Sequence, residues 1–278
     1  MKILDLVLSV VVVVVMAFPL FADIVISNNF DGIADDVGPA FQLLTNGASG
    51  GGGTFDANTG IVSVGGNNDG STTATGFNNG SLAALGADVE SITATFVIDS
   101  VDNVLFSRSN GFFLGLVTGL PEATNPAGPG LFNNSAGSVG LRFNSPDNTT
   151  AALGDFQLLT DPVTDDAGAT ILQNGTAPTV ASIEDGFTFV VTLNNDGTLD
   201  ASTTGLSTEI SASGLAFSGP SFADFLTEGV GVNATFQGGG GGFTVGSVIV
   251  ETTVAVPEPS SLALLSLATL GVVIRRRR

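Results

Sequence analysis

The feature that most constrains the fold is an alternation of apolar and polar residues in several short segments. The clearest examples are residues 91–99 (SITATFVID), 186–194 (GFTFVVTLN), 229–237 (GVGVNATFQ) and 243–253 (FTVGSVIVETT). Successive residues of an extended chain face opposite sides, so each segment has one apolar face and one more polar face. Phenylalanine and β-branched residues are typical of such half-buried strands. The pattern therefore predicts β-strands that each bury one face.

Turn-forming clusters separate these strands, and the 38 glycines are about twice the average usage. No long amphipathic helix is predicted; residues 81–86 (SLAALG) and 220–227 (PSFADFLT) each fit a single helical turn. A body of about 230 residues with many short strands and no fixed repeat fits one sandwich or barrel. We therefore predict an all-β fold, a single antiparallel β-sandwich spanning residues 23–254.

The order of these strands resembles that of concanavalin-like and laminin-G-like jelly rolls. The resemblance rests on five successive segments: ESITATFVIDS, NGFFLGLV, GSVGLRF, DGFTFVVTLNNDGTL and FTVGSVIVETT. It implies a jelly roll whose bent front sheet often holds a carbohydrate or calcium site, and a different β-sandwich is the alternative. Chain ends usually meet in one sheet of a jelly roll. We therefore expect Ile24–Ile26 to pair antiparallel with the strand at Val248–Glu251.

Residues 1–22 have the pattern of a signal peptide. Lys2 supplies a positive charge, an apolar helical segment follows, and Ala22 precedes the expected cleavage point at Asp23. The alternative is an uncleaved membrane helix from Leu6 to Ala22.

Residues 255–278 form a three-part tail. Pro257, Glu258 and Pro259 precede a short apolar segment from Leu262 to Ile274, predicted to be helical. This segment has 13 residues, whereas a membrane-spanning helix needs about 20. The chain then ends in four arginines, which should stay on the cytoplasmic side of a membrane: Arg275, Arg276, Arg277 and Arg278.

This tail resembles the PEP-CTERM sorting signal of Gram-negative bacteria, a region also labelled as the C-terminal domain of ice-binding proteins. The resemblance implies recognition by an exosortase-type membrane enzyme and removal of the tail near the Pro-Glu-Pro. It also implies export to the cell surface or extracellular matrix, with transient anchoring in the inner membrane. A simple tail anchor is the alternative. The ice-binding label describes the tail alone and does not make the chain bind ice.

The body is strongly acidic. Between Asp23 and Val256 there are 24 acidic residues and two basic ones, Arg108 and Arg142, which gives a charge of −22. Such a surface repels phosphate backbones, so nucleic acid is excluded as a partner.

The composition also argues against an enzyme. The chain has no Cys or His, and its body has no Lys, which excludes the usual nucleophilic and Schiff-base chemistry. Paired carboxylates remain, but Glu184 and Asp185 are adjacent and would face opposite sides of a strand. We predict no catalytic residues and no cofactor.

A carbohydrate-binding module is the alternative function. The chain has no Trp and no Tyr to stack on a sugar. Without Cys or His, a metal site would have oxygen ligands only, which suit calcium. The expected partner of such a module is exopolysaccharide. Residues 65–72 (GGNNDGST) and 192–200 (TLNNDGTLD) fit a calcium loop only in part and are predicted to be hairpin turns. Five Asn-x-Ser/Thr sequons, Asn233 among them, indicate surface-type composition.

The sequence thus predicts an exported, non-enzymatic surface or matrix protein. Arg142 is the one ligand candidate. In SVGLRF it alternates with Val139, Leu141 and Phe143, so it should lie on the outer face of its sheet. Its planar donor group suits a carboxylate or sugar hydroxyls, and a surface ion pair with a neighbouring carboxylate is the alternative.

Overall fold

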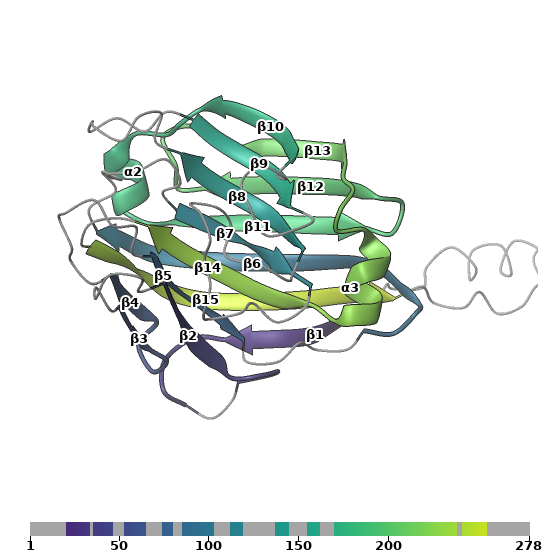
Figure 1. Cartoon of the computed structure of the whole chain (residues 1–278), viewed down its shortest axis with the longest axis horizontal. Helices are drawn as coiled ribbons and strands as arrows, with labels where there is room; N and C mark the ends of the chain where they lie inside the picture. Colours follow the sequence, from purple (N-terminus) through teal and green to yellow (C-terminus); the bar gives the residue numbers. More distant parts are fainter. Residues whose placement is uncertain are drawn as a thin grey trace, which may run out of the picture.

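The computed structural model is a sandwich of two antiparallel sheets, drawn one in front of the other in Figure 1. It describes residues 21–33, 36–46, 53–64, 74–79, 85–102, 112–118, 137–144, 155–161, 170–237 and 241–254. The signal segment and the sorting tail therefore lie outside the described residues, apart from the last two residues of the signal segment.

Each sheet combines strands that are consecutive in the sequence with strands that are distant in it. The eight-stranded sheet runs β13 (Ser211–Ala216), β12 (Thr198–Thr204), β11 (Phe187–Asn194), β6 (Val89–Asp102), β15 (Gly241–Val254), β4 (Ile61–Val64) and β3 (Thr54–Asp56), with β1 (Phe21–Asn28) also paired with β15. The seven-stranded sheet runs β10 (Thr170–Thr176), β9 (Asp155–Asp161), β8 (Ser138–Asn144), β7 (Phe112–Val117), β14 (Gly231–Gln237), β5 (Ala74–Asn79) and β2 (Phe41–Asn46).

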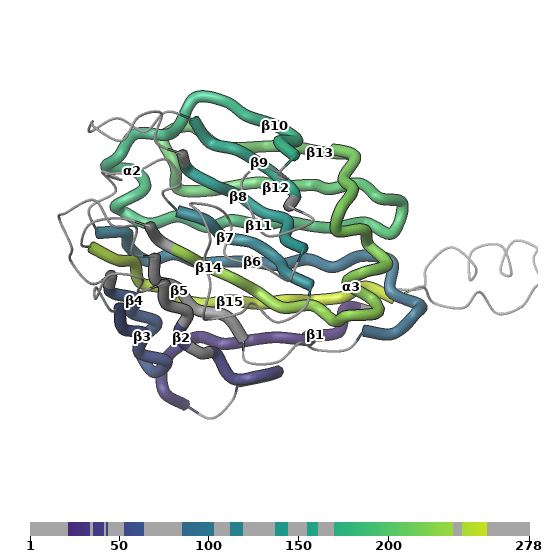
Figure 2. The backbone as a smooth tube through the Cα atoms, in the orientation of Figure 1, coloured from purple at the N-terminus to yellow at the C-terminus, as the bar shows by residue number. Residues whose placement is uncertain are grey.

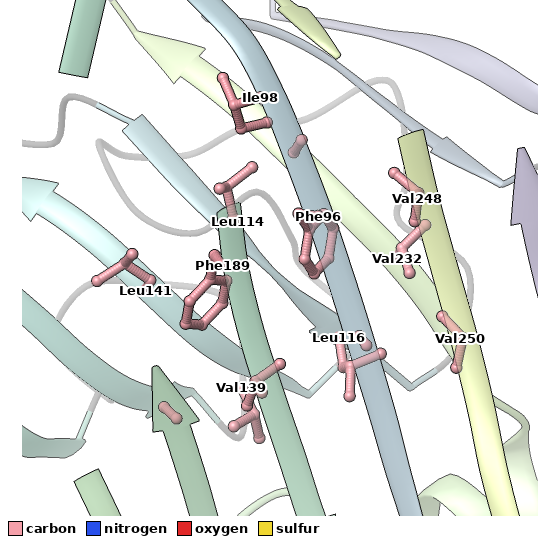
Figure 3. Close-up of a cluster of buried hydrophobic side chains, with 14 of the residues drawn as sticks. Phe96, Ile98, Leu114, Leu116, Val139, Leu141, Phe189, Val232, Val248 and Val250 are labelled. Carbon is pink, nitrogen blue, oxygen red and sulfur yellow. The ribbon is translucent and has the colours of Figure 1, made fainter. Parts of the chain in front are cut away.

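The core lies between the sheets and is built from the alternating residues that the sequence predicts. Along β6 the residues Ile92, Ala94, Phe96 and Ile98 are buried, while the threonines between them are half-buried on the other face. Phe96 stacks on Phe189 of β11 with ring centroids 6.1 Å apart. Figure 3 shows these rings among apolar side chains from both sheets: Ile98, Leu114, Leu116, Val139, Leu141, Val232, Val248 and Val250.

The first and last strands of the body are neighbours, as predicted. In β1, Ile24 lies opposite Glu251 and Ile26 lies opposite Val250 of β15, in antiparallel register with a bulge between them. The two strands run side by side in Figure 2, in purple and yellow. Ala22 and Asp23, the predicted signal-cleavage residues, already belong to β1.

In the described part of the chain, two short helices interrupt the strands. The predicted turn at 220–227 is confirmed as α3 (Phe222–Glu228), which begins with a capping box between Ser221 and Asp224. The predicted turn at 81–86 falls mostly outside the described residues. Among the described helices, none is long and apolar enough to cross a membrane.

The second helix corrects the expectation for Glu184 and Asp185. These residues do not belong to a strand: Glu184 ends α2 (Val180–Glu184), and Asp185 is its C-cap. The Thr179 side chain accepts a hydrogen bond from the backbone N–H of Ser182 and so caps the first turn. This local capping produces a helical turn between two β-rich segments.

The predicted hairpin at 192–200 is confirmed. Strand β11 ends at Asn194 and β12 begins at Thr198, with Gly197 at a φ of 80° in the turn between them. The Asp196 carboxylate accepts hydrogen bonds from the backbone N–H and the hydroxyl of Thr198. This aspartate therefore stabilises the turn. Residues 65–72, the other predicted turn, lie outside the described residues.

Candidate functional site

The outer face of the seven-stranded sheet is the candidate site. It consists of the residues on β7, β8, β9 and β14 that point away from the core. Five of the nine buried polar side chains in the described part of the chain lie on it: Ser138, Arg142, Gln157, Asn233 and Thr235. Buried polar side chains need hydrogen-bond partners, so their concentration makes this outer face the candidate site.

Arg142 lies on this face, opposite the buried core residues Val139, Leu141 and Phe143. The sequence favoured an exposed position for this arginine, but the side chain is only 8% exposed. Strand β8 places it directly opposite Gln157 of β9. Its Nε and Nη2 groups donate to Gln157 Oε1 at 2.9 and 2.5 Å.

Phe113 covers a pair of glycines beside Arg142. Gly115 of β7 lies directly opposite Gly140 of β8. A Cβ atom added to Gly115 would lie 2.5 Å from Phe113 Cζ, and one added to Gly140 would lie 2.8 Å from Phe113 Cε2. The ring therefore lies over both glycines, and it packs with Leu159 of β9. The two glycines provide the room that the aromatic ring occupies.

Asn233 and Thr235 form a second polar pair on this face. The Thr235 hydroxyl donates to Asn233 Oδ1 at 2.9 Å, and both residues are 1% exposed. Asn233 Nδ2 donates to no acceptor among the residues that the structure describes. The surface-type interpretation of its sequon is wrong for Asn233, because this asparagine is buried in a central strand.

The face opens at its β10 edge. Strand β10 is the end strand of the sheet, and its Asn174 lies opposite Gln157 and is exposed. Ile171 lies opposite Leu159 and is 47% exposed. A ligand could therefore approach Gln157 from the side of β10.

The electrostatics of the two sheets differ. Arg142 is the one Lys or Arg among the described residues, and it lies on the seven-stranded sheet.

On the eight-stranded sheet, the hydroxyl of Ser213 holds the pKa of Asp200 below its usual value, with further hydrogen bonds from Asn194 and from the Gly214 N–H. Asp200 lies opposite a β-bulge formed by Ser213 and Gly214 at the β13 edge. This carboxylate has a local structural role away from the candidate site.

The described residues hold no group of three carboxylates that could bind a metal ion. The calcium candidate at 192–200 is a hairpin whose carboxylate accepts hydrogen bonds within the turn.

Comparison with known proteins identifies the tail. Residues 255–278 match the family profile of the PEP-CTERM protein-sorting motif. The chain carries a PEP-CTERM sorting motif. The predicted sorting residues, from Pro257 to Arg278, fall within this match but outside the described structure. The PEP-CTERM signal implies an exported protein that its tail anchors transiently in a membrane.

Comparison with solved structures identifies the fold of the body that precedes the PEP-CTERM motif. Arcelin-5, a lectin-like defence protein from Phaseolus vulgaris, has a TM-score of 0.53 at 10% identity over 84% of this chain and 99% of arcelin-5. The Lotus tetragonolobus seed lectin has a TM-score of 0.51 at 13% identity over 86% of this chain and 100% of the lectin. The Bauhinia forficata lectin, solved with GalNAc, has a TM-score of 0.51 at 11% identity over 85% and 99%. No curated protein sequence matches the chain.

These similarities show the fold alone. They confirm the predicted concanavalin-like jelly roll, an antiparallel sandwich of the lectin type. Sequence reasoning placed Arg142 on the outer face but missed Gln157, Asn233 and Phe113. Gln157 was difficult to identify from the sequence because Leu158 and Leu159 follow it in DFQLLTD. These two leucines would face opposite sides of a strand, so the segment has no clear polar face.

Proposed function

We propose that the protein is a non-enzymatic component of the bacterial cell surface or extracellular matrix. Signal peptidase would cut after Ala22, and an exosortase-type enzyme would remove the tail near Pro257, leaving a mature body of about residues 23–256. The sorting motif at residues 255–278 carries this proposal. The absence of Cys and His from the whole sequence supports a non-enzymatic role and a body that uses no cofactor.

Intact-mass analysis of the protein released by the producing bacterium tests this proposal. The expected mass corresponds to a chain that lacks both terminal segments. Recovery of Arg275–Arg278 on the released form would contradict sorting by an exosortase.

A second function has its own support. We propose that the outer face of the seven-stranded sheet binds carbohydrate, with exopolysaccharide as the partner. Its buried side chains Arg142, Gln157 and Asn233 all carry N–H donors, and sugars offer many acceptor oxygens. A screen of the released protein on immobilised polysaccharides, in calcium and in EDTA, tests for binding and for a calcium requirement. No binding under either condition would leave the structural role alone.

A further inference from the structure

The Arg142–Gln157 pair fixes the direction of the Gln157 amide. A guanidinium group has only donors, so the atom that faces Arg142 must be the amide oxygen. Both Nε and Nη2 of Arg142 donate to this single oxygen. Gln157 Nε2 therefore points away from Arg142, and a flipped amide would place N–H groups against N–H groups.

Gln157 Nε2 is a buried hydrogen-bond donor. The Gln157 side chain is 7% exposed, and Nε2 donates to no acceptor among the residues that the structure describes. A buried N–H group without a partner is destabilising, and native proteins seldom keep one. A buried N–H group whose direction is fixed by a neighbouring arginine is suited to donate a hydrogen bond to a ligand.

We propose that Gln157 Nε2 donates a hydrogen bond to an acceptor oxygen of a bound neutral glycan. Arg142 is then a positioning residue, which holds the amide in its ligand-binding orientation. This inference rests on the proposed carbohydrate-binding function and assigns that site a donor and a ligand class.

Charge favours a neutral glycan over an anionic one. The body between Asp23 and Val256 carries a charge of −22, which repels polyanions at long range. The Nε and Nη2 groups of Arg142 are directed at an uncharged amide. Gln157 and Asn233, whose amide N–H groups have no acceptor among the described residues, are both neutral side chains. A glycan would reach Gln157 from the β10 side, where the neighbouring Asn174 is exposed.

The decisive substitution is Gln157→Glu in the full chain. A carboxylate of the same shape accepts a bidentate hydrogen bond from Arg142 but has no N–H to donate. We expect binding to neutral polysaccharides to weaken at least about tenfold. We also expect the melting temperature to stay equal or rise, because the substitution removes an unmatched donor.

Gln173→Glu is the matched control. Gln173 lies on the neighbouring strand β10, and its Nε2 donates to the Ser211 carbonyl at 3.5 Å, toward the other sheet. The change in charge is the same as in Gln157→Glu. Binding by this variant should equal that of the wild type.

Arg142 is tested with two variants. Arg142→Ala leaves the Gln157 amide free to rotate and should weaken binding, whereas Arg142→Lys keeps one donor facing Oε1 and should restore part of it. A purely structural role would lower the melting temperature of both variants without this difference in binding.

The probes are arrays of neutral gluco-, galacto- and manno-oligosaccharides, with alginate as the anionic comparison. Equal binding by wild type and Gln157→Glu would overturn the role of Gln157 while leaving carbohydrate binding in place. Preference for alginate would overturn the neutral ligand class. Failure of the wild type to bind any glycan would overturn both the inference and the carbohydrate-binding function.

Discussion

Ala22 lies directly opposite Thr253, so both ends of the body are held in one pair of strands. The sorting motif begins only two residues after Thr253. The predicted signal-cleavage point therefore lies beside the strand that leads into the sorting motif.

The first prediction concerns the strand that signal cleavage leaves behind. A cut after Ala22 removes Phe21 and Ala22 from β1 but keeps the pairs from Asp23–Thr252 to Asn28–Val248. Replacing Ile26, which is buried in this strand, by Ala should destabilise the mature protein by about 2–4 kcal/mol. Urea unfolding measures the loss. Stability equal to that of the wild type would show that β1 does not hold the mature fold.

The second prediction concerns the stacked rings of the core. Phe189→Ala removes the ring that stacks on Phe96 and leaves a cavity between the sheets, so it should cost about 3–5 kcal/mol. Ile61→Ala provides the comparison, because Ile61 is 45% exposed and its loss should cost less than about 1 kcal/mol. Urea unfolding measures both variants. Similar losses of unfolding free energy in Phe189→Ala and Ile61→Ala would contradict the placement of Phe189 in the core.

The third prediction concerns the paired glycines under Phe113. A Cβ atom on Gly140 would lie 2.1 Å from the Leu114 carbonyl oxygen, so Gly140→Ala must displace backbone as well as the ring. We expect a cost of about 1–3 kcal/mol, measured by thermal unfolding. Gly86→Ala should be nearly neutral, because nothing lies within 4 Å of its added Cβ.

The fourth prediction concerns pH. Hydrogen bonds from Ser213, Asn194 and Gly214 lower the pKa of Asp200 in the folded state below its usual value of 3.8. Its contribution to stability is therefore present above pH 3.8 and is lost as the pH falls through the lower folded pKa. Asp200→Asn should reduce the melting temperature at pH 7, and its difference from the wild type should shrink toward zero at the acid end. If the difference in melting temperature instead grows as the pH falls, the lowered pKa of Asp200 is not the source of the stability.

The alternation of apolar and polar residues was sufficient to predict the strands that have one buried face and one half-buried face. Along β11, Phe187, Phe189, Val191 and Leu193 are buried and the residues between them are half-buried, as the alternation indicates. The pairing of β1 with β15 was also predictable, since both ends of the body are short β-rich segments.

The candidate site was less predictable, because it depends on strands that meet across the sheet. Arg142 and Gln157 become partners through the register of β8 against β9, and nothing in either local segment specifies that register. Strand β7 is buried on both faces, so its residues do not alternate in polarity and Phe113 cannot be distinguished from a core residue. The helix α2 was missed because a single capping residue, Thr179, defines its start.

The position of β15 links folding to secretion. This strand pairs with β1, β4 and β6, yet it is the last part of the body to be synthesised and to cross the membrane. Contacts between the two ends of a chain have the greatest sequence separation, and they form late and slowly. Until residues 241–254 are present, β1, β4 and β6 lack the strand with which all three pair. The eight-stranded sheet therefore cannot be completed before the residues that immediately precede the sorting motif are available for folding.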